Sequence, residues 1–133
     1  MKEINLEAKV ENLDKVLAFI DAELEAVDCP MKHQMQIDVA VEELFVNIAN
    51  YAYGDKTGNA TIEIEAKDGQ ATVTFTDEGV QYDPLKKEDP DVTLSAEERQ
   101  IGGLGIFIVK KSMDEMKYRY EDGKNILTIV SYW

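Results

Sequence analysis

A glycine-rich segment near the C-terminus has the composition of a phosphate-binding turn. Gly102, Gly103 and Gly105 surround Leu104 directly before a stretch with helical periodicity. Glycine permits strained backbone, and the exposed amides of a helix N-terminus suit phosphate oxygens. The segment is not a Walker A loop, because no Gly-Lys-Ser/Thr follows, and it is not the Gly-x-Gly-x-x-Gly turn of a dinucleotide fold. A glycine-rich turn without a ligand is the alternative interpretation.

A carboxylate at the end of a predicted strand has the parity of the buried face. The apolar residues of the segment 71–75 alternate with threonines, and Asp77 continues the alternation, so its side chain is expected on the core side. A buried carboxylate needs a strong hydrogen-bond donor, and at Gly79 backbone can approach a ligand closely. If the strand ends at Thr76, Asp77 instead begins a turn, and these residues alone leave both interpretations open.

A third segment carries an acid and an amide on one face of a predicted helix. Glu43 and Asn47 are four residues apart, so their side chains lie one above the other. The alternative interpretation is a solvated helix face, and the pair alone does not decide between the two.

Hydrophobic periodicity predicts the elements that position these segments. We expect strands at residues 4–10, 61–66, 71–77, 118–121 and 126–132, and helices at 13–27 (after an N-cap at Asn12), 31–51 and 106–113. Residues 85–101 form a 17-residue loop of the kind that is usually functional or disordered. This order predicts an α/β two-layer sandwich, with one mixed, mostly antiparallel sheet and helices on one face. We expect a single domain over residues 1–133.

Composition narrows the classes of partner. The net charge is −13, and an acidic surface repels phosphate backbones and anionic lipid, which disfavours direct nucleic-acid and membrane-surface binding. No run approaches the ~20 apolar residues of a membrane helix. A single cysteine, Cys29, excludes an internal disulfide, and we expect a packed thiol in a cytoplasmic protein. Met31 and Met35 are expected in the core rather than on a partner surface.

The order and spacing of the three segments resemble the GHKL (Bergerat-fold) ATPases. Glu-x-x-x-Asn on a helix, Asp-x-Gly after a strand, a long loop and Gly-x-Gly opening a helix follow one another in residues 43–47, 77–84, 85–101 and 103–109. The endings Tyr82-Asp83-Pro84 and Met113-Asp114-Glu115-Met116 look like the branch of stand-alone anti-sigma factors that are also serine kinases. The resemblance covers residues 6–133.

The resemblance implies a role for each residue around the base and the metal. Asp77 would accept a hydrogen bond from the exocyclic amine of adenine, and Gly79 would let the base approach. Asn47 would be the side-chain ligand of Mg²⁺. Glu43 would be the general base, whereas its rival Glu42 points away from Asn47 by helix geometry.

The resemblance also implies how the rest of ATP is held. Backbone amides of Gly103, Leu104 and Gly105 would meet the phosphates, and residues 85–101 would be the ATP lid. Thr128 or Asn125 would hydrogen-bond the base region.

One departure from the family pattern concerns charge at the terminal phosphate. Family members often carry a basic residue three or four positions after the helix Asn, where this chain has Asn50 and Tyr51. Arg99 or Lys110 would then have to supply that charge, unless it is absent.

The implied function is a regulatory kinase that binds ATP and Mg²⁺, sequesters a sigma factor and phosphorylates a serine on a STAS-domain antagonist. The second hypothesis is an ATP-binding docking module with little or no catalysis. The missing basic residue favours the module, and Glu43 favours the kinase. A third class, a protein-interaction domain without nucleotide, requires all three segments to be coincidental. The N-terminal strand offers an edge for a homodimer.

Overall fold

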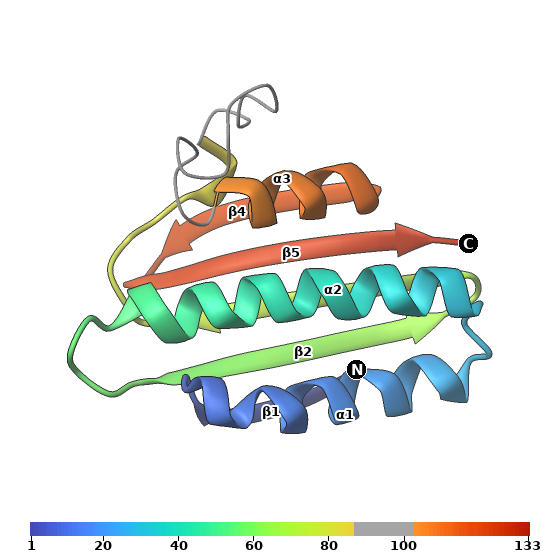
Figure 1. Cartoon of the computed structure of the whole chain (residues 1–133), viewed down its shortest axis with the longest axis horizontal. Coiled ribbons are helices and arrows are strands. Elements are labelled where there is room, and N and C mark those ends of the chain that lie inside the picture. Colours follow the sequence, from blue (N-terminus) through green and yellow to red (C-terminus); the bar gives the residue numbers. More distant parts are fainter. Residues whose placement is uncertain (87–102) are drawn as a thin grey trace.

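The computed structural model describes residues 1–86 and 103–133, in which a five-stranded sheet carries three α-helices on one face (Figure 1). The strands, in the sheet order β1-β2-β3-β5-β4, are β1 (Lys2–Glu7), β2 (Asn59–Lys67), β3 (Gln70–Asp77), β5 (Lys124–Tyr132) and β4 (Glu115–Glu121), and the helices are α1 (Leu13–Ala26), α2 (Met31–Asn47) and α3 (Gly103–Ser112). The predicted α/β two-layer sandwich is confirmed.

Every pair of neighbouring strands is antiparallel, so the prediction of a mixed sheet was wrong for the part of the chain described. The reason lies in the connections. The helices α1 and α2 run in opposite directions between β1 and β2, so β2 enters the sheet antiparallel to β1 (Figure 1). Strands β3 and β4 run in the same direction, but β5 lies between them and is antiparallel to both.

The two hairpins turn at Asp-Gly pairs, as the sequence predicts. Asp68 and Gly69 have φ values of 52° and 78°, and Asp122 and Gly123 have 54° and 76°. Two successive positive φ values fit the type I′ turn, whose twist matches that of the flanking strands.

The core lies between the sheet and the helices and follows the predicted alternation. On β3 the buried positions are 71, 73, 75 and 77, and Asp77 is only 6% exposed. The strand therefore continues through Asp77, and the alternative in which it ends at Thr76 is wrong. The largest fully buried side chains are Phe45, Phe75, Ile20, Leu24, Ile37, Ile62, Ile64 and Ile129.

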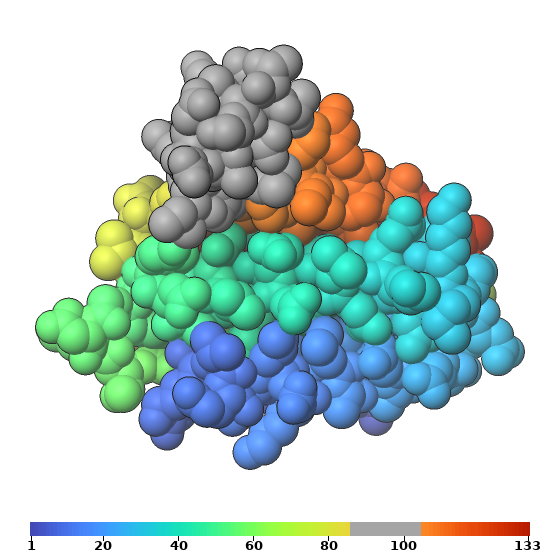
Figure 2. Space-filling view, in the orientation of Figure 1, coloured from blue at the N-terminus to red at the C-terminus, as the bar shows by residue number. Residues whose placement is uncertain are grey.

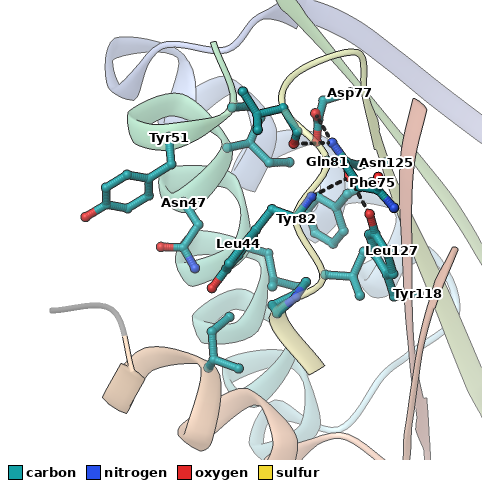
Figure 3. Close-up of a pocket in the computed structure, with 15 residues that line it drawn as sticks. Leu44, Asn47, Tyr51, Phe75, Asp77, Gln81, Tyr82, Tyr118, Asn125 and Leu127 are labelled. Atoms are coloured by element: carbon teal, nitrogen blue, oxygen red, sulfur yellow. Dashed lines mark hydrogen bonds between the residues drawn. The ribbon is translucent and has the colours of Figure 1, made fainter. Parts of the chain in front are cut away.

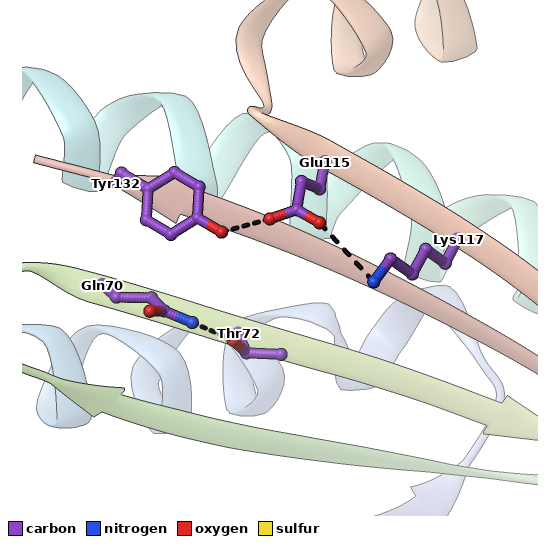
Figure 4. A network of polar contacts seen from close by, with 5 residues as sticks. All are labelled: Gln70, Thr72, Glu115, Lys117 and Tyr132. Carbon is purple, nitrogen blue, oxygen red and sulfur yellow. Dashed lines mark hydrogen bonds and ion pairs between the residues drawn. The ribbon is translucent and has the colours of Figure 1, made fainter.

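None of the described helices covers the other face of the sheet (Figure 1). Its side chains are mostly polar, as on β3, where Gln70, Thr72, Thr74 and Thr76 lie on this face. The Tyr132 hydroxyl donates a hydrogen bond to Glu115, whose other carboxylate oxygen lies 3.5 Å from Lys117 Nζ, and Gln70 Nε2 donates to Thr72 Oγ1 at 3.2 Å (Figure 4). Side chains with this parity therefore point away from the core.

Several local predictions differ from the structure. Val10 lies in a 3₁₀ turn (Val10–Asn12) after the strand, and the Asn12 side chain donates to the Glu7 carbonyl at 2.9 Å instead of capping α1. The predicted second helix continues beyond Asn47 as a π-helix, η2 (Ile48–Ala52). Met31 and Met35 are 68% and 61% exposed, so their predicted core position was wrong.

Part of the predicted site cannot be compared with the structure. After a short 3₁₀ turn, η3 (Pro84–Lys86), the rest of the predicted lid, with Arg99 and Gly102, lies outside the described residues.

The helices lie side by side over the sheet (Figure 2). Carboxylate side chains of α1 and α2 cluster between the two helices. Gln34, 8% exposed, donates from Nε2 to Asp21 Oδ1 at 3.1 Å and to Glu25 Oε2 at 3.3 Å. Burial, with Asp21 beside it, raises the pKa of Asp38 to about 7. The α1–α2 seam therefore contains a carboxyl group that holds its proton near neutrality.

This carboxyl group makes stability depend on pH in a predictable direction. Between about pH 4 and pH 7 the folded chain keeps a proton on Asp38 that the unfolded chain releases, so the free energy of unfolding falls as pH rises through this range. Asp38→Asn should flatten that fall, measured by urea unfolding at several pH values, and Asp14→Asn, at an exposed carboxylate of α1, should leave it unchanged. An equal pH dependence in Asp38→Asn and wild type would contradict this assignment.

Candidate functional site

A cavity of about 390 Å³ opens between the end of α2, the end of β3 and strands β5 and β4 (Figure 3). This volume suits a small-molecule ligand. Asp77 and Asn125 lie at one side, and Asn47 and Tyr51 lie at the other (Figure 3). Apolar side chains form most of the remaining wall, including Leu44, Ile48, Phe75, Ile106 and Leu127.

The buried Asp77 carboxylate is held by two donors and has one acceptor atom left. Its Oδ1 accepts from the Gly79 backbone amide at 2.9 Å and from Asn125 Nδ2 at 3.0 Å. Within the described residues Oδ2 has no hydrogen bond, and Asp77 lines the cavity. The site therefore offers a ligand an anionic acceptor at its inner end.

Asn125 connects this carboxylate to the elements around it. It lies opposite Asp77 in the β3–β5 register and is 6% exposed. Its Nδ2 also donates to the Val80 carbonyl at 2.9 Å, and its Oδ1 accepts from the Tyr82 amide at 3.1 Å and from the Tyr118 hydroxyl at 2.5 Å. One side chain thus joins β3, the loop that follows it and β4.

Thr128, predicted as an alternative to Asn125 beside the base, does not reach the cavity. It lies three positions further along β5 and has the opposite parity, so it faces the polar side of the sheet. Its Oγ1 lies 3.3 Å from Thr74 Oγ1. We therefore withdraw Thr128 from the candidate site and keep Asn125.

Gly79 is required by the protein's own backbone. A Cβ at this position would lie 2.2 Å from the Ala52 carbonyl oxygen, and the next residue, Val80, donates its amide to that oxygen at 2.8 Å. The sequence predicted a close approach by a ligand, whereas the structure shows a close approach by the end of η2.

Tyr53, which no sequence pattern singled out, holds the same region from the other side. Its hydroxyl accepts from the Glu78 amide at 2.8 Å and donates to the Asn59 carbonyl at 2.5 Å. Burial raises the pKa of Tyr53, so the phenol remains protonated at neutral pH. It therefore fixes the start of the loop that follows Asp77.

Asn47 and Glu43 lie on the side of α2 that approaches α3. Asn47 is half-buried and lines the cavity. Glu43 is half-buried one turn earlier and contacts the start of α3, because a Cβ on Gly105 would come within 2.1 Å of its Oε2. Glu42 is exposed. Of the two acids, only Glu43 therefore lies beside the glycine segment.

The glycine segment forms the first turn of α3. Gly103 is the first residue of the helix, followed by Leu104 and Gly105. The first four amides of a helix have no intrahelical acceptor and carry a partial positive charge. The Glu43 carboxylate lies beside the third residue of this turn, Gly105, so an acidic side chain already lies next to a helix end that is suited to an anion.

Of the two predicted sources of positive charge, Arg99 lies outside the described residues and Lys110 does not lie at this turn. Lys110 lies in the last turn of α3, seven residues and about 10 Å along the helix from Gly103. Asn50 is exposed and Tyr51 is 57% exposed, both on η2.

Across residues 1–86 and 103–133, no group of three or more His, Cys, Asp or Glu side chains could hold a metal ion. Burial raises the pKa of the Cys29 thiol, the opposite of what a nucleophilic thiolate needs.

Comparison with known families decides between these possibilities. The family described as the histidine kinase-like ATPase domain matches residues 6–131. The chain belongs to this family. Membership of the histidine kinase-like ATPase family implies that the chain binds ATP.

Individual relatives of this ATPase domain are named as a serine-protein kinase and as an anti-sigma factor. A serine-protein kinase RsbW from Listeria monocytogenes is 30% identical over 96 residues, which are 68% of this chain and 61% of the relative. The chain thus spans about three-fifths of the length of that kinase. An anti-sigma F factor from Clostridium acetobutylicum is 24% identical over 128 residues, which are 96% of this chain and 90% of that protein.

A solved structure confirms the fold. The RsbU and RsbW domains of a Mycobacterium tuberculosis protein match with a TM-score of 0.64 and 14% identity, over 99% of this chain and 32% of that chain.

Substitution by alanine should change the stability of this ATPase domain differently at its two site glycines, Gly79 and Gly105. Gly79→Ala places a methyl group against the Ala52 carbonyl, which is rigid backbone, and should lower the free energy of unfolding by about 1–3 kcal/mol. Gly105→Ala meets only the mobile end of Glu43 and gains helix propensity, so its change should stay within about 1 kcal/mol. Urea unfolding measures both, and equal losses would show that the Ala52 contact does not determine the choice of glycine.

Proposed function

We propose that this chain binds ATP with Mg²⁺ in the cavity, sequesters a sigma factor, and phosphorylates a serine of a STAS-domain antagonist. The observation that carries the proposal is the buried Asp77, whose Oδ2 is left as an acceptor in a cavity close to the first turn of α3. An anionic acceptor at one end and helix amides without an intrahelical acceptor at the other match the two ends of a nucleotide.

The base occupies the inner part of the cavity. Asp77 Oδ2 accepts from the exocyclic amine of adenine, and the apolar walls, with Ile48 and Leu127, contact the ring. Guanine presents a carbonyl oxygen at the same position, so a fixed carboxylate repels it. Recognition of this kind discriminates strongly, because the wrong base leaves a buried polar group unpaired.

The phosphates lie toward the backbone amides of Gly103, Leu104 and Gly105. The donor set fits Mg²⁺, which takes one or two protein oxygens and otherwise binds phosphate and water. The Asn47 amide oxygen at the cavity wall would hold it, and the ion would neutralise phosphate charge.

Glu43 accepts the proton of the substrate serine. As the serine Oγ forms its bond to the terminal phosphorus and ADP leaves, the hydroxyl proton passes to the Glu43 carboxylate. The position of Glu43 beside Gly105 supports this role, because it lies where the phosphate-binding turn begins. Phosphate oxygens and this carboxylate are both anions, so Glu43 shifts away from Gly105 when ATP binds.

The relatives support the choice of protein partners, since one is named a serine-protein kinase and another an anti-sigma factor. The net charge of −13 disfavours direct binding to nucleic acid.

Strand β1 lies at one edge of the described sheet, and we propose that a homodimer forms there. No helix in the described part is long and apolar enough to cross a membrane, and we propose a cytoplasmic protein.

A docking module that binds ATP without transferring phosphate is the second candidate. It is favoured by Asn50 and Tyr51, which stand where the family often has a basic residue.

Phosphate transfer separates the two candidates. Glu43→Gln should bind ATP nearly as wild type but transfer phosphate about 10²–10⁴-fold more slowly, because a positioned general base contributes about that much. Asn47→Ala should lose Mg²⁺-dependent binding and transfer together. The exposed Glu42→Gln is the matched control and should retain both.

The assay follows radiolabel from ATP to candidate STAS-domain proteins. Transfer by Glu43→Gln at the wild-type rate would exclude Glu43 as the base. Tight ATP binding by wild type without transfer to any STAS substrate would favour the docking module.

A further inference from the structure

We infer that Asn125 is a positioning residue, which fixes the Asp77 carboxylate and the loop after β3 for base recognition and makes no contact with the ligand itself. The inference rests on the proposed binding of adenine at Asp77. It replaces the role predicted from sequence, in which residue 125 hydrogen-bonds the base region.

The hydrogen-bonding capacity of the Asn125 amide is already used. An amide group has two N–H donors and an oxygen with two lone pairs. The donors reach Asp77 Oδ1 and the Val80 carbonyl, and the oxygen accepts from the Tyr82 amide and the Tyr118 hydroxyl (Figure 3). A ligand could bond to Asn125 only by displacing one of these partners.

The partners also fix which way the amide points. A backbone N–H can only donate and a backbone carbonyl can only accept, so the oxygen must face Tyr82 and the nitrogen must face Val80. Burial raises the pKa of Tyr118, which keeps its hydroxyl available as a donor to the same oxygen. The flipped amide would place donor against donor and acceptor against acceptor.

This orientation decides how Asp77 meets the base. With Oδ1 held by Asn125 and the Gly79 amide, the carboxylate cannot rotate, and Oδ2 alone faces the ligand as an acceptor. Buried polar networks of this kind are strong when every member is satisfied. We expect the preference for a 6-amino over a 6-oxo purine to depend on Asn125.

Asn125→Asp tests the inference because it keeps the shape of the side chain but replaces the amide donor to Asp77 by a carboxylate oxygen, which is an acceptor. Two carboxylates would then share the 3.0 Å contact, and such a pair retains a proton well above the usual carboxyl pKa. Titratable groups around the pair are Glu78 and Asp83 in the loop, Tyr53 directly after η2, and Tyr118 and Tyr120 on β4. All of them are acidic, so none compensates the added charge.

The main measurement is the dissociation constant of ATP for Asn125→Asp relative to wild type, by calorimetry at about pH 8 and about pH 6. We expect a deficit of about tenfold or more at the higher pH, where the donor to Asp77 is lost, and a smaller one at the lower pH, where a shared proton restores it. Asn5→Asp is the matched control. It removes a hydrogen-bond donor to Thr61 on the polar face of the sheet, and its affinity for ATP should equal that of wild type at both pH values.

A second measurement needs no nucleotide. The paired carboxyl holds its proton only in the folded chain, so the stability gap between wild type and Asn125→Asp should widen as pH rises above about 4. If Asn125→Asp does not fold at the higher pH, Tyr118→Phe carries the test. It should reduce the preference for ATP over inosine triphosphate by about two- to tenfold.

The outcomes separate this inference from the proposed function. A deficit in ATP binding that is absent, or equal at both pH values, would overturn the positioning role. An unchanged preference for ATP in Tyr118→Phe would do the same. A wild type that binds no ATP while the pH-dependent stability gap persists would overturn the proposed function, and with it the role of Asn125 in base recognition, but not the contact between Asn125 and Asp77.

Discussion

The site depends on keeping an ionised carboxylate at the buried end of an inner strand. Asp77 is 6% exposed, and a carboxylate in that environment is costly unless donors surround it. The chain supplies them from the following loop and from the neighbouring strand, through the Gly79 amide and Asn125. The loop can turn back to donate only because Gly79 packs directly against the Ala52 carbonyl. Much of the local architecture around the cavity therefore serves this one charged group.

The junction between helices α2 and α3 forms the end of the site that lies opposite Asp77. The start of α3 lies beside the later part of α2, where Glu43 meets Gly105 (Figure 1). This places helix amides that lack an intrahelical acceptor near the acid of the other helix. We propose that a ligand with a base and a phosphate chain lies between the strand end and this junction.

The sequence predicts local features of this site better than features that depend on which strand residues lie opposite one another in the sheet. The alternation of β3 correctly places Asp77 on the core side, and Asp-Gly pairs correctly locate both hairpin turns. The choice between Asn125 and Thr128 depends on the β3–β5 register, which no local pattern encodes. Gly79 is read as a ligand contact because the sequence cannot show that η2 ends against it. Met31 and Met35 are exposed, although the sequence predicts them in the core. The prediction was wrong because the sequence of a helix with several apolar stripes does not reveal which stripe packs against the sheet.

The central claim is that Asp77 recognises the amine of adenine through its free oxygen, and the dissociation constant of ATP for Asp77→Asn measures this most directly. The substitution keeps the size of the side chain, removes its charge and replaces one acceptor by an amide donor. We predict a dissociation constant raised by about 100-fold, because a charged hydrogen bond is lost and a buried group is left mispaired. A dissociation constant equal to that of wild type, in a variant that still folds, would contradict it.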